Sequence, residues 1–333
     1  MQFSEIRVRT RIHPDELEAK KGLVLESGDL DIQLTGPTIV KKATGERLAT
    51  YLPGVLKDLS EPMYDILHGL KGYQTDNRGL ASGSGRGAMR AGRELAEQVA
   101  EGQSRTRSMP ISSAIVGSFD AKPPKNYCRL TAWTGKEWEQ YRGLFPYFQR
   151  IGAHFAEHVP DRYAAQMDVV SETNPDWVIE GTPFSTATVN NSYPTGVHTD
   201  SGDLESGFSN LAVIRRGNYS GGIFTFAEYR IGVDMQDGDL LLMDAHEWHG
   251  NTSMWCNVCG DRIGPGGRDD HDVTCGVERI STVAYYRTKV AKCGSAEEEQ
   301  RRAIAWRERT IALGGGAVDP EVIEQMAAEA AGG

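Results

Sequence analysis

No apolar run in the 333-residue sequence approaches 18 residues, so we expect no transmembrane helix. The N-terminal stretch, residues 1–21, lacks the apolar core of a secretory signal, and we therefore expect a cytoplasmic protein. Cysteine is scarce, and the odd count of five argues against a disulfide framework. Free thiols or a metal site remain as roles for these cysteines. The sequence also lacks internal repeats.

An excess of positive charge is also missing, since 46 acidic residues outnumber 36 basic ones and give a net charge of −10. This balance argues against a general nucleic-acid coat protein. The exception is the stretch 75–108, which combines a Gly/Ser-rich loop, six arginines and a helical composition at 89–100. Two interpretations stay open for this stretch: a solvated loop and helix surface, or an element that contacts phosphate groups.

Glycine, by contrast, is abundant, and 38 glycines favour a turn-rich β architecture over a helical bundle. Between residues 184 and 289, short strand-like runs alternate with turn residues, which predicts a sandwich or barrel. Short strands are also expected at 31–34, 38–42 and 49–52, helices at 135–168 and 295–310, and a last short helix after 316. We expect one domain, 1–333, made of N-terminal strands and supporting helices (1–183), a β core (184–290) with an insertion (255–277), and a helical tail (291–333).

Two imidazoles and a carboxylate stand out within the β region. His198 and Asp200 are separated by one residue of a strand-like run, so their side chains project from the same face. A second strand, 238–244, leads on to His249. Such a set leaves coordination positions open on Fe(II). His246 lies three residues before His249 and competes with it for the third ligand position.

The last strand-like run, 278–287, has an unusual polar face. Alternation places an arginine and a serine on the side that would point into a barrel. A guanidinium buried there needs an anionic partner, because leaving it unpaired is costly. The partner is either a bound dicarboxylate or a structural carboxylate of the protein. The side chains on this face are Arg279, Ser281, Val283, Tyr285 and Arg287.

The insertion carries a second possible metal site. Cys256 and Cys259 are followed by His271 and Cys275, with spacings that suit a tetrahedral structural Zn(II). The alternative is a set of reduced thiols in a flexible loop. Cys128 and Cys293 have no such spacing, and we expect ordinary packing or surface roles for them.

These motifs together resemble a known group. The motifs are HTD at 198–200, GDLLLMDAHEWHGN at 238–251 and RISTVAYYR at 279–287, preceded by DNRGLASG at 76–83 and FSTATVN at 184–190. Their combination resembles the TET/JBP family of Fe(II)/2-oxoglutarate-dependent DNA 5-methylpyrimidine dioxygenases, in particular its bacteriophage and bacterial members. The resemblance implies an α+β fold with a double-stranded β-helix (jelly-roll, cupin-like) core and flanking helices. It also implies that the chain is an enzyme that uses Fe(II), 2-oxoglutarate and O2.

The resemblance also implies roles for individual residues. Counting from Gly238, the third iron ligand of the family falls on His249, and His246 becomes a supporting histidine. Tyr285 falls where the family stacks an aromatic ring on the target base. The full set is His198, Asp200 and His249 for iron; Arg279, Ser281 and Asn190 for 2-oxoglutarate; and Asp203, Tyr285, Arg287, Asn77 and Arg78 for the substrate.

The chemistry agrees with DNA as partner. A methyl C–H bond is too strong for acid–base catalysis and needs an oxidant made from O2 as 2-oxoglutarate is decarboxylated. An enclosed site can reach the methyl group only if the base is flipped out or single-stranded. A carboxylate at Asp203 and a cation at Arg287 favour 5-methylcytosine over thymine, unless the two side chains only pair with each other. Two rivals stay open: a hydroxylase of the same fold acting on a protein or small molecule, and a non-catalytic zinc-stabilised β-helix.

Overall fold

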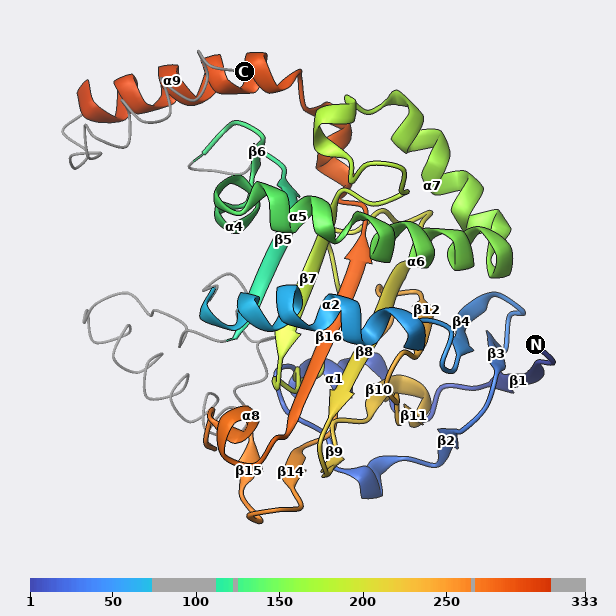
Figure 1. Ribbon diagram of the computed structural model, residues 1–333. Helices are drawn as coiled ribbons and strands as arrows, with labels where there is room; N and C mark the ends of the chain where they lie inside the picture. Colours follow the sequence, from blue (N-terminus) through green and yellow to red (C-terminus); the bar gives the residue numbers. More distant parts are fainter. Residues whose placement is uncertain (74–111, 122–124, 265–266, 313–333) are drawn as a thin grey trace, which may run out of the picture.

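The computed structural model describes residues 1–73, 112–121, 125–264 and 267–312. The arginine-rich stretch with its expected helix at 89–100, and the expected helix after 316, lie outside these ranges. The described chain forms three β-sheets, of which the two larger face each other, with helices across the outer face of the largest sheet (Figure 1). None of the described helices has both the length and the apolarity needed to cross a bilayer.

The larger sheet has nine strands and is antiparallel except for the pairing of its first two strands. Strand β16 lies inside it, hydrogen-bonded to β7 on one side and to β8 on the other. In spatial order the strands are β1 (Ser4–Val8), β3 (Thr38–Lys42), β4 (Arg47–Leu52), β12 (Leu240–Met243), β8 (Ser209–Arg216), β16 (Glu278–Tyr285), β7 (Thr186–Asn191), β5 (Ser113–Phe119) and β6 (Arg129–Leu130).

The smaller sheets complete the expected β architecture. A four-stranded sheet contains β13 (His249–Asn251), β10 (Phe224–Phe226), β11 (Ile231–Val233) and β2 (Ile32–Leu34), and a three-stranded one contains β15 (Arg262–Ile263), β14 (Met254–Cys256) and β9 (Tyr219–Gly221). The strands predicted before residue 53 are present as β2, β3 and β4. Strands β2 and β4 pair with strands of the 184–290 region, so the β core draws on both parts of the chain.

The helices predicted over 135–168 form a row of four elements. Proline stands in the first turn of α6 and of α7, where it is compatible with a helix start but ends the preceding helix. The helices are α1 (Pro14–Ala19), α2 (Lys57–Gly69), α4 (Ala132–Lys136), α5 (Trp138–Gly143), α6 (Phe145–His158), α7 (Pro160–Glu172), α8 (His271–Thr274) and α9 (Ala296–Ala312). Short 3-10 turns occupy Ser27–Asp29, Leu70–Gly72, Pro175–Trp177, Ala227–Tyr229 and Thr288–Lys292.

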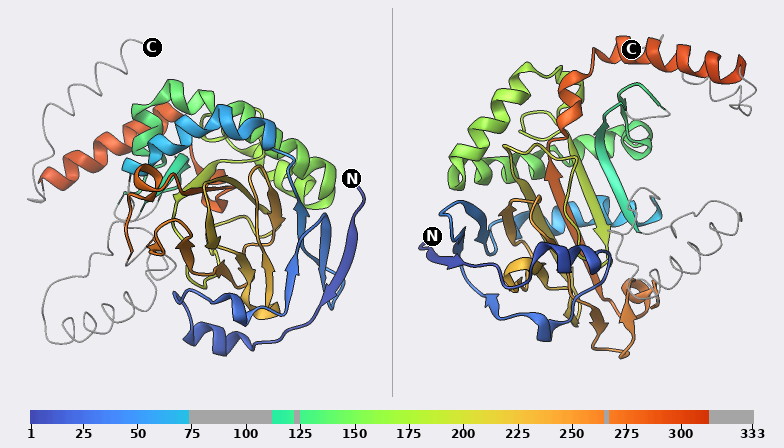
Figure 2. Two further views of the ribbon diagram at one scale, coloured as in Figure 1. Left: turned by 60° about the horizontal axis from the view of Figure 1, so that its bottom comes forward. Right: turned by 180° about the vertical axis from the view of Figure 1, so that it is seen from behind.

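Two apolar cores lie on opposite faces of the larger sheet. In β12, Leu240 and Leu242 pack against the helices, whereas Leu241 and Met243 pack against the four-stranded sheet. The run of apolar residues in this strand is therefore explained by burial on both faces. The left view of Figure 2 shows α2 and α4 to α7 gathered on one side of the strands. The functional site must lie on the other side, between the sheets.

The insertion after β14 brings its four predicted zinc ligands together. One ligand atom from each of Cys256, Cys259, His271 and Cys275 lies within 4.8 Å of the others. Cys256 and His271 are buried, while Cys259 is exposed. Because this loop buries few apolar side chains, a bound metal ion would supply much of its folding free energy. Zinc binding stays a prediction.

The expectation for Cys128 and Cys293 was wrong. They form a disulfide bond across a sequence separation of 165 residues, and both are buried. Next to it, the backbone N–H of Cys128 donates to a carboxylate oxygen of Glu299 at 2.7 Å. The disulfide and this hydrogen bond attach the edge of the sheet, at β6, to the start of α9. The partners were missed because their spacing carries no local signal.

Metal analysis of protein purified without chelators should find about one zinc per chain bound to the insertion. Cys259→Ser should lose this zinc and lower the melting temperature, because the loop loses its metal crosslink. Val258→Ser, at the exposed neighbouring position, is the matched control and should keep the metal. Zinc-free protein with all four candidate ligands intact and reduced would contradict the assignment.

Removal of the disulfide should destabilise the fold. The Cys128→Ser/Cys293→Ser variant should lose about 2–4 kcal/mol of unfolding free energy, because its unfolded chain is no longer constrained by the bond. Urea denaturation measures this loss, and wild-type protein treated with reductant should show a similar one. If all five cysteines of unreduced, unfolded protein react with a maleimide, the disulfide is absent.

Candidate active site

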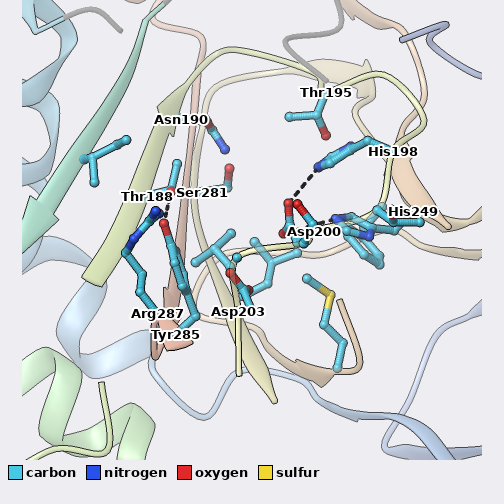
Figure 3. Close-up of a pocket in the computed structure, with 18 of the residues that line it drawn as sticks. Thr188, Asn190, Thr195, His198, Asp200, Asp203, His249, Ser281, Tyr285 and Arg287 are labelled. Carbon is cyan, nitrogen blue, oxygen red and sulfur yellow. Dashed lines mark hydrogen bonds and ion pairs between the residues drawn. The ribbon is translucent and has the colours of Figure 1, made fainter. Parts of the chain in front are cut away.

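A cavity of about 350 Å³ opens between the larger sheet and the four-stranded sheet. One wall is formed by the inward face of β16 and its neighbours β7 and β5. The opposite wall carries the two imidazoles (Figure 3). The predicted site residues that line this one cavity are Asn190, His198, Asp200, Asp203, His249, Arg279, Ser281, Tyr285 and Arg287.

His198 and His249 are held side by side by their backbones. Each backbone N–H donates to the other residue's carbonyl, at 2.8 and 2.9 Å, and the ring centroids are 4.3 Å apart. Glycine at position 250 favours this approach, because a Cβ there would lie 3.0 Å from the Gly196 backbone, while a Cβ on Gly196 would lie 2.5 Å from the Gly22 backbone. The glycine that follows His249 in the sequence motif is therefore a packing requirement.

The protonation of both rings is set by backbone carbonyls. The Nδ1 atom of His198 lies 2.7 Å from the carbonyl of Gly196, and that of His249 lies 2.8 Å from the carbonyl of Glu247. A carbonyl oxygen only accepts, so each Nδ1 carries the proton and each Nε2 offers a lone pair. The carboxylate of Asp200 faces both Nε2 atoms, at 3.6 and 3.8 Å. Two nitrogen donors and one carboxylate thus converge on one point, as Fe(II) requires.

His246 is directed elsewhere. Its Nδ1 lies 3.2 Å from the carboxylate of Asp244, and this hydrogen bond raises the pKa of His246. It is not among the residues that line the cavity. The structure thus groups His249, and not His246, with His198 and Asp200. The assignment of iron to these three residues stays a prediction.

Arg279 projects from β16 into the same cavity and is only 3% exposed. Burial lowers the pKa of its guanidinium. Its Nη2 atom is buried and has no hydrogen-bond partner among the described residues. An unsatisfied buried donor costs free energy, so the site fits a carboxylate that arrives from outside. Ser281 and Asn190, opposite each other across β16 and β7, lie on the same wall.

Tyr285 and Arg287 occupy the other end of the β16 wall. The hydroxyl of Tyr285 lies 3.4 Å from that of Thr188. The Arg287 guanidinium forms an ion pair with Asp120, with its Nε and Nη2 atoms each 2.6 Å from Oδ1. Asp203 and Arg287 form a backbone bridge, and the positive charge of Arg287 acts on the Asp203 carboxylate. The sequence expectation that Arg287 and Asp203 read the base edge, or pair with each other, did not include Asp120.

Asp203 is held in a different environment. Its carboxylate accepts a hydrogen bond of 2.6 Å from the Ser209 hydroxyl. Burial, together with the negative charge of Asp200, raises the pKa of Asp203 to about 7. A protonated Asp203 could donate a hydrogen bond as well as accept one. Asn77 and Arg78, the two remaining predicted substrate residues, lie outside the described residues.

Comparison with known proteins agrees with this geometry. The Tet_JBP family, the oxygenase domain of the 2OGFeDO (2-oxoglutarate- and Fe(II)-dependent dioxygenase) superfamily, matches residues 116–288, which is more than half of the chain. The chain is 34% identical over 194 residues to thymine dioxygenase JBP1 of Trypanosoma brucei brucei, covering 57% of this chain and 21% of the relative. It is 30% identical over 285 residues to thymine dioxygenase JBP1 of Leishmania tarentolae, covering 80% and 32%.

The chain therefore spans only about a fifth to a third of the length of these relatives. A solved structure, NgTET1 in complex with 5mC DNA, shares the fold with a TM-score of 0.51 at 14% identity, covering 81% of this chain and 84% of that one. This likeness confirms the expected α+β double-stranded β-helix. From the family match, this chain belongs to the TET/JBP family of the 2-oxoglutarate- and Fe(II)-dependent dioxygenase superfamily.

Proposed function

We propose that this protein is a dioxygenase that hydroxylates the 5-methyl group of a pyrimidine base in DNA. One observation carries the proposal: a single cavity contains an iron-type donor set, a buried guanidinium nitrogen that has no hydrogen-bond partner in the part of the chain that the structure describes, and an aromatic ring beside polar side chains. These groups match what the reaction needs, namely a metal, a dicarboxylate and a base. A hydroxylase of a protein or small molecule would need the first two only.

The residues present fit both cofactors of the superfamily. His198, Asp200 and His249 would hold Fe(II), and Arg279 with Ser281 and Asn190 would hold the distal carboxylate of 2-oxoglutarate. When bound, these cofactors supply with O2 the oxidant that breaks the methyl C–H bond. The backbone carbonyls behind both imidazoles select the tautomer with the proton on Nδ1 and orient each ring, so that Nε2 of the neutral imidazole would face the metal.

A base can reach this cavity only outside the duplex stack. Tyr285 supplies a ring for stacking, at the end of β16 away from Arg279. Asp120 neutralises Arg287 and fixes its orientation, which makes the guanidinium a directional donor toward the base edge. Asp120 is thus a positioning residue in this proposal.

We favour 5-methylcytosine as the base, to be oxidised to 5-hydroxymethylcytosine. An ionised Asp203 would accept from the cytosine N4 amine, and Arg287 would donate to the acceptors on the same edge. Thymine is the second candidate, and two observations favour it. The relatives in Trypanosoma and Leishmania are thymine dioxygenases, and a protonated Asp203 can donate to the thymine O4 atom.

The decisive experiment is nucleoside mass spectrometry. The protein is incubated with Fe(II), 2-oxoglutarate, ascorbate and single- or double-stranded DNA that contains either 5-methylcytosine or thymine as the only 5-methylpyrimidine. The expected result is a hydroxymethyl nucleoside that depends on 2-oxoglutarate. Product from thymine alone reverses the base preference. Without product from either base, but with turnover of 2-oxoglutarate on a protein or small molecule, the rival hydroxylase is correct.

The two histidines should behave differently when replaced. His249→Ala should lose Fe(II) binding and turnover, because only two donors remain at the site. His246→Ala should keep measurable activity and normal iron content, since its ring hydrogen-bonds Asp244 instead. Iron titration and turnover measure both effects. If the His246→Ala variant is inactive while the His249→Ala variant still binds iron and turns over, the ligand assignment is reversed.

Arg279→Lys should raise the KM for 2-oxoglutarate by about 10- to 100-fold, because an ammonium group cannot reproduce the two parallel hydrogen bonds of a guanidinium. Excess 2-oxoglutarate should partly restore the rate. Arg216→Lys is the matched control, since Arg216 pairs with Glu61 on the surface and does not line the cavity. Equal KM values for Arg279→Lys and wild type would place the carboxylate anchor elsewhere.

A further inference from the structure

We infer that Arg129, with Lys125 and Arg307, binds a backbone phosphate of the DNA strand whose base enters the cavity. The inference rests on the proposed function and extends it from the base to the backbone. None of these three residues was singled out by the sequence motifs. The arginine lines the cavity, Lys125 is exposed four residues before it, and the half-buried Arg307 follows Trp306, whose ring lies 5.9 Å from that of Tyr127.

The position of Arg129 follows from the strand order. Strand β6 is the outermost strand of the larger sheet, and Arg129 pairs directly with Phe119 of β5. Residues paired across two strands project from the same face, so Arg129 and Phe119 both line the cavity. Arg129 is half-buried, whereas His198 and Arg279 are almost fully buried. It therefore stands where the backbone of a flipped nucleotide remains.

The guanidinium of Arg129 is held in place by aromatic rings. Its central carbon lies 5.1 Å from the ring of Phe119 and 5.9 Å from the ring of Tyr127. Its Nη1 atom is buried and has no hydrogen-bond partner among the described residues. Asp120, a carboxylate that lines the same cavity, is paired with Arg287. A preoriented donor without a partner fits an anion supplied by the ligand.

Two further cations gather around it. Burial and the positive charges of Arg129 and Arg307 lower the pKa of Lys125. Like charges this close repel each other, and an anion between them would relieve the repulsion. Arg307 comes from α9, which the disulfide and the Cys128–Glu299 hydrogen bond attach to β6. The cluster is built from distant segments of a protein whose net charge is −10.

A phosphodiester is the anion that suits this place. The free carboxylate of the co-substrate has its own guanidinium at Arg279, in the interior. Every flipped nucleotide brings two flanking phosphates to the mouth of the cavity. Arginine binds phosphate oxygens through two parallel N–H groups, so one side chain can fix the strand without reading its sequence.

The first test is the salt dependence of DNA binding. Binding of a fluorescent oligonucleotide with one central 5-methylpyrimidine is measured at several salt concentrations for wild type and Arg129→Gln. The variant should bind at least tenfold more weakly at low salt, and the slope of log K against log salt should fall by about 0.7–0.9. Arg301→Gln, an exposed α9 arginine paired with Glu297, removes the same charge and should change neither.

The second test removes the charge from the DNA instead. Each phosphate beside the target base is replaced in turn by a neutral methylphosphonate. One replacement should weaken wild-type binding about tenfold and leave Arg129→Gln unaffected. Equal weakening of both proteins would overturn the inference, as would an unchanged salt slope in Arg129→Gln. The 2-oxoglutarate affinity of the variant, measured in parallel, should equal that of wild type and shows that the variant is folded.

The two levels of the proposal fail in different ways. If the wild-type protein oxidises DNA and the Arg129 variants bind DNA as tightly as wild type, only the phosphate site is overturned. Wild-type protein that neither binds DNA nor oxidises either base overturns the proposed function, and the phosphate site with it.

Discussion

The register of β16 is the constraint on which the site depends. The strand is hydrogen-bonded on both sides, and its side chains alternate between the helix-facing core and the cavity. A slip of one residue would turn Arg279 and Tyr285 into the apolar core and expose Ile280 and Ala284 in the cavity. Burying an unpaired guanidinium in that core would cost several kcal/mol. The packing of the helices therefore fixes the polar wall of the site.

The opposite wall depends on a close backbone approach. His198 and His249 exchange backbone hydrogen bonds, with Gly250 close against the Gly196 backbone, and this pairing fixes the positions of the two rings. Carbonyls then set the proton on each ring. The positions of the two imidazoles are thus determined by main-chain atoms, which side-chain substitutions elsewhere disturb little. The site combines one wall set by side-chain burial with another set by backbone contacts.

The features that could be predicted from the sequence are those encoded by residues close together in the chain. Alternation identified the inward face of β16, and the spacing of the β runs predicted a two-sheet core, because both signals lie within a few residues. The side-chain partners of Arg287 and Cys128 could not be found in this way. Asp120 and Cys293 reach them only through tertiary contacts, and nothing in their neighbouring residues distinguishes them. The paired guanidinium of Arg287 also changes the charge that a base would meet.

The length of β16 has a further consequence. Arg279 and Tyr285 are six residues apart on an extended strand, which separates their Cα atoms by roughly 20 Å. The two ends of this cavity wall are thus well separated in space. Under the proposed function, the co-substrate would lie at the Arg279 end and the base at the Tyr285 end. Substitutions at Tyr285, Arg287 and Asp120 would then change which base is accepted with little effect on the co-substrate site, and base preference would diversify through a few side chains at one end of the cavity.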